Sequence, residues 1–152
     1  MEPHHMSVDR GPPPKVAVEP QFEPFSKAHA AGRPQVLWTR LVADLETPVS
    51  AMLKLGRGRA NSVLLESVEG GAVRGRYSII GIEPDLIWRA FGDRAELNRD
   101  PASGAAFVAQ SAGTLASLRA LIAESRIELP EDLPPMAAGI IGYMSYDTIT
   151  LV

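Results

Sequence analysis

The sequence has 152 residues, a length that suits one globular domain or a part of one. Hydrophobic residues make up 45% and charged residues 22%, which is the balance of a folded protein. The net charge of −3 argues against a nucleic-acid binder, and the lack of cysteine excludes disulfides and thiolate chemistry. No apolar run of about twenty residues and no secretory leader is visible. We therefore expect a cytoplasmic protein with no membrane partner.

The chain begins with a segment that offers little to bury. Residues 1–20 are rich in proline and charge, so we expect a disordered tail there and a folded domain over 21–152. His4 and His5 lie in this tail without fixed geometry, which makes them a weak metal site. A short helix is predicted over Phe22–Gly32, where apolar residues share one face and a glycine follows.

A strand and a helix are predicted next. Val36–Val42 is apolar with little alternation, which is typical of a strand covered on both faces. Thr47 and Pro48 suit the cap and first turn of a helix that ends at Gly56. The apolar side of this helix is expected to carry Val49, Met52 and Leu53. The turn that follows, Leu55–Arg59, lacks the spacing of a phosphate-binding loop and is interpreted as a solvated basic turn.

The two runs Val63–Val68 and Gly75–Gly81 flank a glycine-bearing turn and predict a β-hairpin. Polar residues interrupt these runs: Glu66, Ser67, Arg76, Tyr77 and Ser78. A carboxylate can bind an ammonium group, while hydroxyls and a guanidinium can bind a carboxylate. Such a cluster could hold a zwitterionic amino acid. The alternative is that an Arg–Glu pair across a hairpin is ordinary surface chemistry.

The second half predicts another antiparallel pair, Asp85–Phe91 with Arg94–Asn98, joined at Gly92-Asp93. Trp88 of this pair is interpreted as a core residue. A helix is predicted over Thr114–Ser125. Its apolar stripe is expected to comprise Leu115, Leu118, Leu121 and Ile122. A linker over 129–135 then leads to a glycine-rich strand over 137–143. Paired strands with inserted helices predict an α+β fold with a mostly antiparallel sheet and flanking helices.

Catalytic patterns are missing from the sequence. Ser67 lacks a nucleophile-elbow context, and no histidine is placed to complete a triad. No pair of carboxylates forms a motif for acid–base work or Mg²⁺. The residues by themselves therefore point to a binding or structural unit.

Three motifs resemble the N-terminal region of anthranilate synthase component I, in the chorismate-using enzyme superfamily. They are Leu64–Ser67, Gly75–Gly81 and Pro135–Asp147, the last a glycine-rich run ending in Gly-Tyr and then Tyr-Asp. The resemblance covers about Val36 to Val152. It implies the N-terminal part of a larger αββα sandwich. Its C-terminal chorismate-binding domain is expected to be absent from this chain, so the chain alone is expected to be inactive.

The resemblance also implies a function for the full-length protein, a lyase of tryptophan biosynthesis that makes anthranilate and pyruvate from chorismate and ammonia or glutamine. It implies Mg²⁺ bound by the missing domain and a glutamine amidotransferase subunit, component II, as partner. L-Tryptophan is the expected feedback inhibitor and allosteric ligand. The resemblance transfers no catalytic or metal residue to this chain. The tryptophan-binding residues that it and the hairpin suggest are Leu65, Glu66, Ser67, Arg76, Tyr77, Ser78 and Tyr143.

Two other interpretations stay open at this point. The related aminodeoxychorismate synthase component I, of folate synthesis, shares the sandwich and often a tryptophan pocket. The third is a non-catalytic interaction module whose exposed sheet edge recruits a partner. The reaction product separates the first two, and the state of the sheet edge tests the third.

Overall fold

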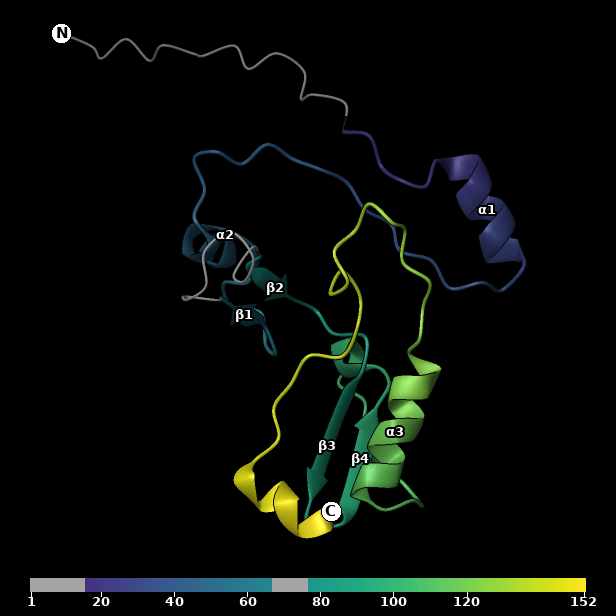
Figure 1. Cartoon of the computed structure of the whole chain (residues 1–152), viewed down its shortest axis with the longest axis vertical. Coiled ribbons are helices and arrows are strands. Elements are labelled where there is room, and N and C mark those ends of the chain that lie inside the picture. Colours follow the sequence, from purple (N-terminus) through teal and green to yellow (C-terminus); the bar gives the residue numbers. More distant parts are fainter. Residues whose placement is uncertain (1–15, 67–76) are drawn as a thin grey trace, which may run out of the picture. The chain divides into compact units, whose positions relative to one another are not determined.

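The computed structural model describes residues 16–66 and 77–152, and the chain contacts divide it into two units, Met1–Ala43 and Asp44–Val152 (Figure 1). Of the tail predicted over 1–20, only 16–20 is described. In the first unit, helix α1 (Phe22–Ala30) confirms the predicted helix, and Gly32 follows it at a φ of 65°. Glu19 and Trp38 exchange backbone hydrogen bonds of 2.8 Å on either side of α1.

The strand predicted over Val36–Val42 is wrong. Trp38 forms only an isolated antiparallel bridge with Glu19, and the other residues of the run join neither sheet of the described chain. Leu41 is 69% and Val42 89% exposed. An apolar run indicates a strand only when a hydrogen-bonding neighbour is present on at least one side, and here a single residue has one.

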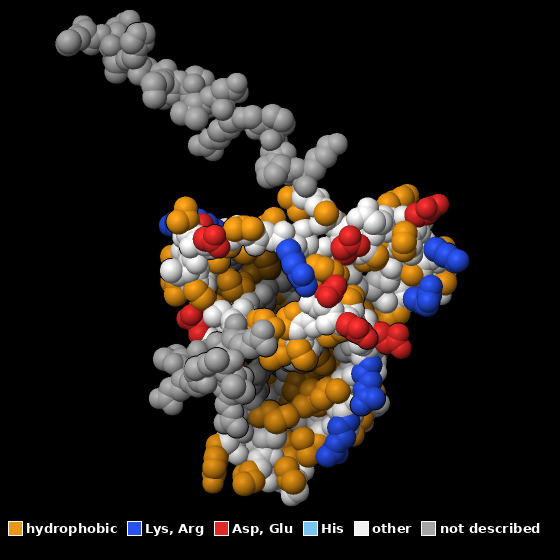
Figure 2. Space-filling view, turned by 45° about the horizontal axis from the view of Figure 1, so that its top comes forward, with side chains coloured by type: hydrophobic (Ala, Val, Ile, Leu, Met, Phe, Trp, Pro, Cys, Tyr) orange, Lys and Arg blue, Asp and Glu red, His pale blue; other side chains and the backbone are white. Residues whose placement is uncertain are grey.

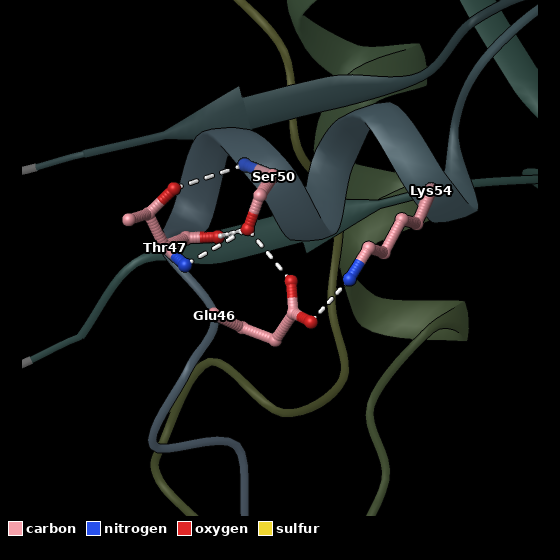
Figure 3. A network of polar contacts seen from close by, with 4 residues as sticks. All are labelled: Glu46, Thr47, Ser50 and Lys54. Carbon is pink, nitrogen blue, oxygen red and sulfur yellow. Dashed lines mark hydrogen bonds and ion pairs between the residues drawn. The ribbon is translucent and has the colours of Figure 1, made fainter.

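Helix α2 (Pro48–Leu55) confirms the second predicted helix, including its cap. Thr47 Oγ1 accepts a hydrogen bond from the Ser50 amide (3.1 Å), and Ser50 Oγ accepts one from the Thr47 amide (2.9 Å) (Figure 3). This reciprocal arrangement satisfies amides that the first turn of a helix leaves unpaired. The expected apolar side is only partly covered, because Val49 is 52% and Leu53 60% exposed.

The predicted hairpin is present as strands β1 (Val63–Leu65) and β2 (Ile79–Gly81). They pair antiparallel, with Val63 opposite Gly81 and Leu65 opposite Ile79. The predicted turn lies in 67–76, outside the described residues. Helix α2 contacts both strands.

The second sheet has three strands, β3 (Ile87–Phe91), β4 (Arg94–Asn98) and β5 (Val108–Ala109), in the order β3-β4-β5. The β3–β4 pair confirms the prediction, and Gly92 in its two-residue turn has a φ of 58°, which glycine adopts without strain. The two-residue β5, after the 3₁₀ helix Pro101–Ser103, was not predicted. All pairs are antiparallel.

Helix α3 (Thr114–Glu124) lies against β4 and supplies the core of this sheet. Leu121 is 3% exposed, beside Ala95 (1%) and Leu97 (6%) of β4. Trp88 is half-buried, and its indole Nε1 donates to Ser117 Oγ at 3.0 Å, as suits a tryptophan packed against a helix. The predicted helix is confirmed, although Ile122 of its stripe is 47% exposed.

Polar contacts at both ends hold α3 to the sheet. The Asp93 carboxylate accepts from the Thr114 amide (2.8 Å), so a turn residue caps the helix N-terminus across the fold. At the other end Arg99 donates to both carboxylate oxygens of Glu124, at 2.6 and 2.7 Å. This pair lowers the pKa of the Glu124 carboxyl, chiefly through the Arg99 hydrogen bonds.

The strand predicted over 137–143 is also wrong. The Ala137 amide donates to the Pro134 carbonyl (2.9 Å) in a turn, and the run beyond it joins neither sheet of the described chain. A 3₁₀ helix, Tyr146–Leu151, follows. The segment 129–135 has no regular structure, as the predicted linker requires.

The two small antiparallel sheets and their helices confirm the predicted α+β class. Buried hydrophobic side chains are few, and large apolar residues are exposed in both units. Figure 2 shows such side chains gathered in patches on the face in view. No helix within the described residues is long and apolar enough to cross a membrane.

Candidate functional site

The β1–β2 hairpin brings together four of the seven residues predicted to bind an amino acid. Leu65, the last residue of β1, pairs with Ile79, and it is 42% exposed. Glu66 directly follows β1 and Ser78 directly precedes β2, and both are exposed. Tyr77, the next residue outward, is 52% exposed. Ser67 and Arg76 lie outside the described residues, so their predicted roles stay predictions.

Tyr143 belongs to a different segment of the chain. Its side chain is 94% exposed. Two residues before it, Ile141 Cδ1 lies 3.6 Å from the point that a β-carbon on Gly81 would occupy. The structure therefore brings the segment that carries Tyr143 to β2 through Ile141.

At the other end of the hairpin, an ion pair joins the segment before β1 to the segment after β2. Arg59 Nη1 contacts Glu83 Oε1. Asn61 and Glu83 both have positive φ, 58° and 50°, a conformation that asparagine tolerates better than glutamate does. The interpretation of Leu55–Arg59 as a solvated basic turn did not include this pair. The signal that could have found the pair is the position of Arg59 and Glu83 just outside two strands already predicted to pair.

Helix α2 has its own polar network where it begins. Glu46 accepts hydrogen bonds from Lys54 and from Ser50 Oγ, the latter at 2.7 Å (Figure 3). Lys54 first, and Ser50 second, lower the pKa of the Glu46 carboxyl. This network links the residue before the cap to the last turn of the helix that packs on the hairpin.

Two hollows on the described surface are lined by residues other than the predicted site residues. One, of about 530 Å³, is lined by residues within 16–25 and by Leu37 in the first unit. The other, of about 380 Å³, lies beside β4 and the start of α3. At the hairpin end, the described residues Leu65, Glu66, Tyr77 and Ser78 form an exposed surface.

This surface has the chemistry of binding. The Glu66 carboxylate can accept from an ammonium group, the Ser78 hydroxyl can donate to a carboxylate, and Leu65 offers apolar contact. The described residues contain no group of three His, Asp or Glu side chains that could hold a metal ion. No magnesium ligand is therefore assigned among them.

Comparison with curated proteins gives consistent matches. Anthranilate synthase component 1 of Cereibacter sphaeroides is 52% identical over 86% of this chain and 26% of its own length. The protein of the same name in Synechocystis is 33% identical over 87% of this chain and 25% of its own length. In Thermus thermophilus the identity is 38% over 71% of this chain and 21% of the relative.

The chain thus spans about a quarter of the length of these relatives. No family model matches the chain, and no solved structure matches it significantly. The match to the first of these relatives covers 132 residues of this chain, well beyond the hairpin motifs. The chain is therefore homologous to anthranilate synthase component 1 and corresponds to its N-terminal region.

Proposed function

We propose that the chain is the N-terminal regulatory region of an anthranilate synthase, in which the β1–β2 hairpin forms half of a binding site for the inhibitor tryptophan. The complete enzyme would convert chorismate and ammonia, or glutamine through an amidotransferase subunit, to anthranilate and pyruvate. The observation that carries the proposal is the 52% identity to a protein of that name. It is supported by the exposed positions of Glu66 and Ser78 next to the paired ends of β1 and β2.

Each proposed contact matches a group of the ligand. Tryptophan carries an ammonium, a carboxylate and an indole. The Glu66 carboxylate would accept from the ammonium, Ser67 or Ser78 would donate to the carboxylate, and Leu65 would pack against the indole. The 42% exposure of Leu65 leaves apolar surface for that contact.

The other side of the pocket would come from residues outside this chain. The described hairpin end is open, whereas sites for small molecules enclose most of the ligand surface. Inhibition would follow if tryptophan binds more tightly to a state with low affinity for chorismate, because a ligand shifts an equilibrium only by its difference in affinity for the two states.

The test uses the complete polypeptide with chorismate and ammonium, and follows anthranilate by its fluorescence. Tryptophan should inhibit the reaction. Ser67→Ala and Ser67→Phe should raise the half-inhibitory concentration by about tenfold or more, because a hydrogen bond to a charged group contributes about 1.5–3 kcal/mol. Each variant is normalised to its own rate without tryptophan.

The reaction product distinguishes the proposed anthranilate synthase from the related aminodeoxychorismate synthase of folate synthesis. Formation of aminodeoxychorismate without anthranilate would contradict the proposed reaction. Unchanged sensitivity to tryptophan in both Ser67 variants would remove that residue from the site.

A further inference from the structure

A glycine of the hairpin lets a distant segment approach it closely. Gly81 ends β2 and pairs with Val63 of β1. A β-carbon built on Gly81 would lie 3.0 Å from Val63 Cγ2 and 3.6 Å from Ile141 Cδ1. The terminal methyl of Ile141 therefore lies close to the position where Gly81, at the end of β2, lacks a side chain.

Ile141 is the most covered large apolar residue of its segment. It is 37% exposed, while Ile140 is 44%, Met144 59% and Tyr143 94% exposed. The segment makes no ladder hydrogen bonds to either sheet of the described chain. Strand pairing therefore does not hold it to the hairpin, and the approach of Ile141 to Gly81 is an apolar one.

The strand that carries this contact is very short. The three-residue β2 has Ser78 of the proposed tryptophan site immediately before it and Gly81 at its other end. The pairs from Leu65–Ile79 to Val63–Gly81 form one hydrogen-bonded ladder. A shift of the backbone at Ser78 on ligand binding would therefore move Gly81, and with it the surface that Ile141 contacts.

We propose that Ile141 is a positioning residue that couples the hairpin site to the chain beyond it, through its contact with Gly81. This inference rests on the proposed function, and it names the first step by which occupancy of that site reaches the rest of the protein. Coupling of this kind is measured as the ratio of the tryptophan dissociation constants with and without chorismate. Tryptophan binds less tightly when chorismate is bound, and chorismate binds less tightly, by the same factor, when tryptophan is bound.

The experiment measures the tryptophan dissociation constant of the complete polypeptide with and without saturating chorismate, by calorimetry and without ammonia. Couplings of this type are about 5–150-fold. Ile141→Val removes only the Cδ1 methyl that lies over Gly81, and Ile141→Ala removes more. The ratio of the two constants should fall at least threefold in the valine variant and approach one in the alanine variant.

Two further variants separate the contact from a general loss of packing. Ile140→Val removes the same methyl from the neighbouring residue and should keep the wild-type ratio. Ile141→Leu retains a terminal methyl and should restore most of it. Thermal unfolding of each variant checks that it folds. Of the two shortened variants at this position, Ile141→Val deletes only one methyl and is expected to lower the stability least.

The outcomes distinguish this inference from the function on which it rests. If the wild type binds tryptophan with a coupling ratio that persists in both Ile141→Val and Ile141→Ala, or that Ile140→Val lowers equally, the positioning role is refuted and the proposed function stands. A wild-type ratio of one also refutes it. If the wild type binds no tryptophan, the regulatory function itself fails, and the inference fails with it.

Discussion

At the end of the hairpin, Leu65, Glu66 and Ser78 are all exposed and offer an aliphatic, an anionic and a hydroxyl group to solvent. An exposed surface of this kind binds a small zwitterion weakly, because water competes for each hydrogen bond. If a second surface enclosed the ligand and excluded water, the same hydrogen bonds would contribute more binding free energy. The residue types thus suit an amino acid, and the open geometry suits a shared site.

Glu46 makes a pH-dependent contribution to folding stability, and the pKa behind it can be measured directly. Its pKa is lowered in the fold, first by the Lys54 hydrogen bond and then by Ser50. A carboxyl whose folded pKa lies below its unfolded pKa stabilises the fold above the unfolded value, and the contribution is lost as pH falls through the folded pKa. NMR titration should show the Glu46 pKa rising toward its ordinary value in Lys54→Met. The variant Lys27→Met, in α1, should leave it unchanged.

Ser117 is expected to matter for stability through its contact with Trp88. The variant Ser117→Ala leaves the half-buried indole N–H without its acceptor at 3.0 Å, so the free energy of unfolding should fall by about 1 kcal/mol. Urea unfolding followed by tryptophan fluorescence measures this. The exposed Ser111, changed to alanine, is the control. Equal stability of the two variants would show that the hydrogen bond contributes nothing.

The elements are stabilised where their ends are capped. In α2, Thr47→Ala removes the hydroxyl that accepts from the Ser50 amide, and caps of this type contribute about 1 kcal/mol. We expect the unfolding free energy to fall by that amount, with Thr47→Ser restoring most of it. A serine variant as unstable as the alanine variant would mean that the hydroxyl is not the cause.

The start of α3 depends on a residue without a side chain. A β-carbon on Gly113 would lie 2.6 Å from Asp93 Oδ1, so Gly113→Ala must displace the carboxylate that caps the Thr114 amide. Destabilisation of about 1–2 kcal/mol is expected. In Asp93→Ala, which has no cap to displace, the same glycine change should cost much less. Additive effects in this double-mutant cycle would contradict the mechanism.

Across the whole molecule, sequence predicted best the elements whose signals are local. The cap of α2, the apolar stripe of α3 and the glycine turn of β3–β4 depend on neighbouring residues, and all of these elements are present. The runs Val36–Val42 and 137–143 have strand composition, but a strand also needs a partner that composition does not reveal. The two-residue β5 is too short to leave a pattern.

In the candidate site, too, the local features could be predicted from the sequence and the long-range contacts could not. The hairpin itself follows from the sequence pattern, whereas its register, which pairs Leu65 with Ile79, does not. The approach of Ile141 to Gly81 could not be predicted, because nothing local in either segment indicates the other. Contacts between distant segments depend on the assembled fold, and regulation of the kind proposed here would use such contacts.

The central claim is that the hairpin end binds tryptophan through Glu66. The most direct measurement is calorimetric titration of tryptophan into the complete polypeptide, comparing wild type with Glu66→Gln and with Glu128→Gln, an exposed acid after α3. Loss of a charge-assisted bond predicts a dissociation constant about tenfold or more higher for Glu66→Gln, and wild-type affinity for Glu128→Gln. Equal affinity in all three proteins would contradict the account.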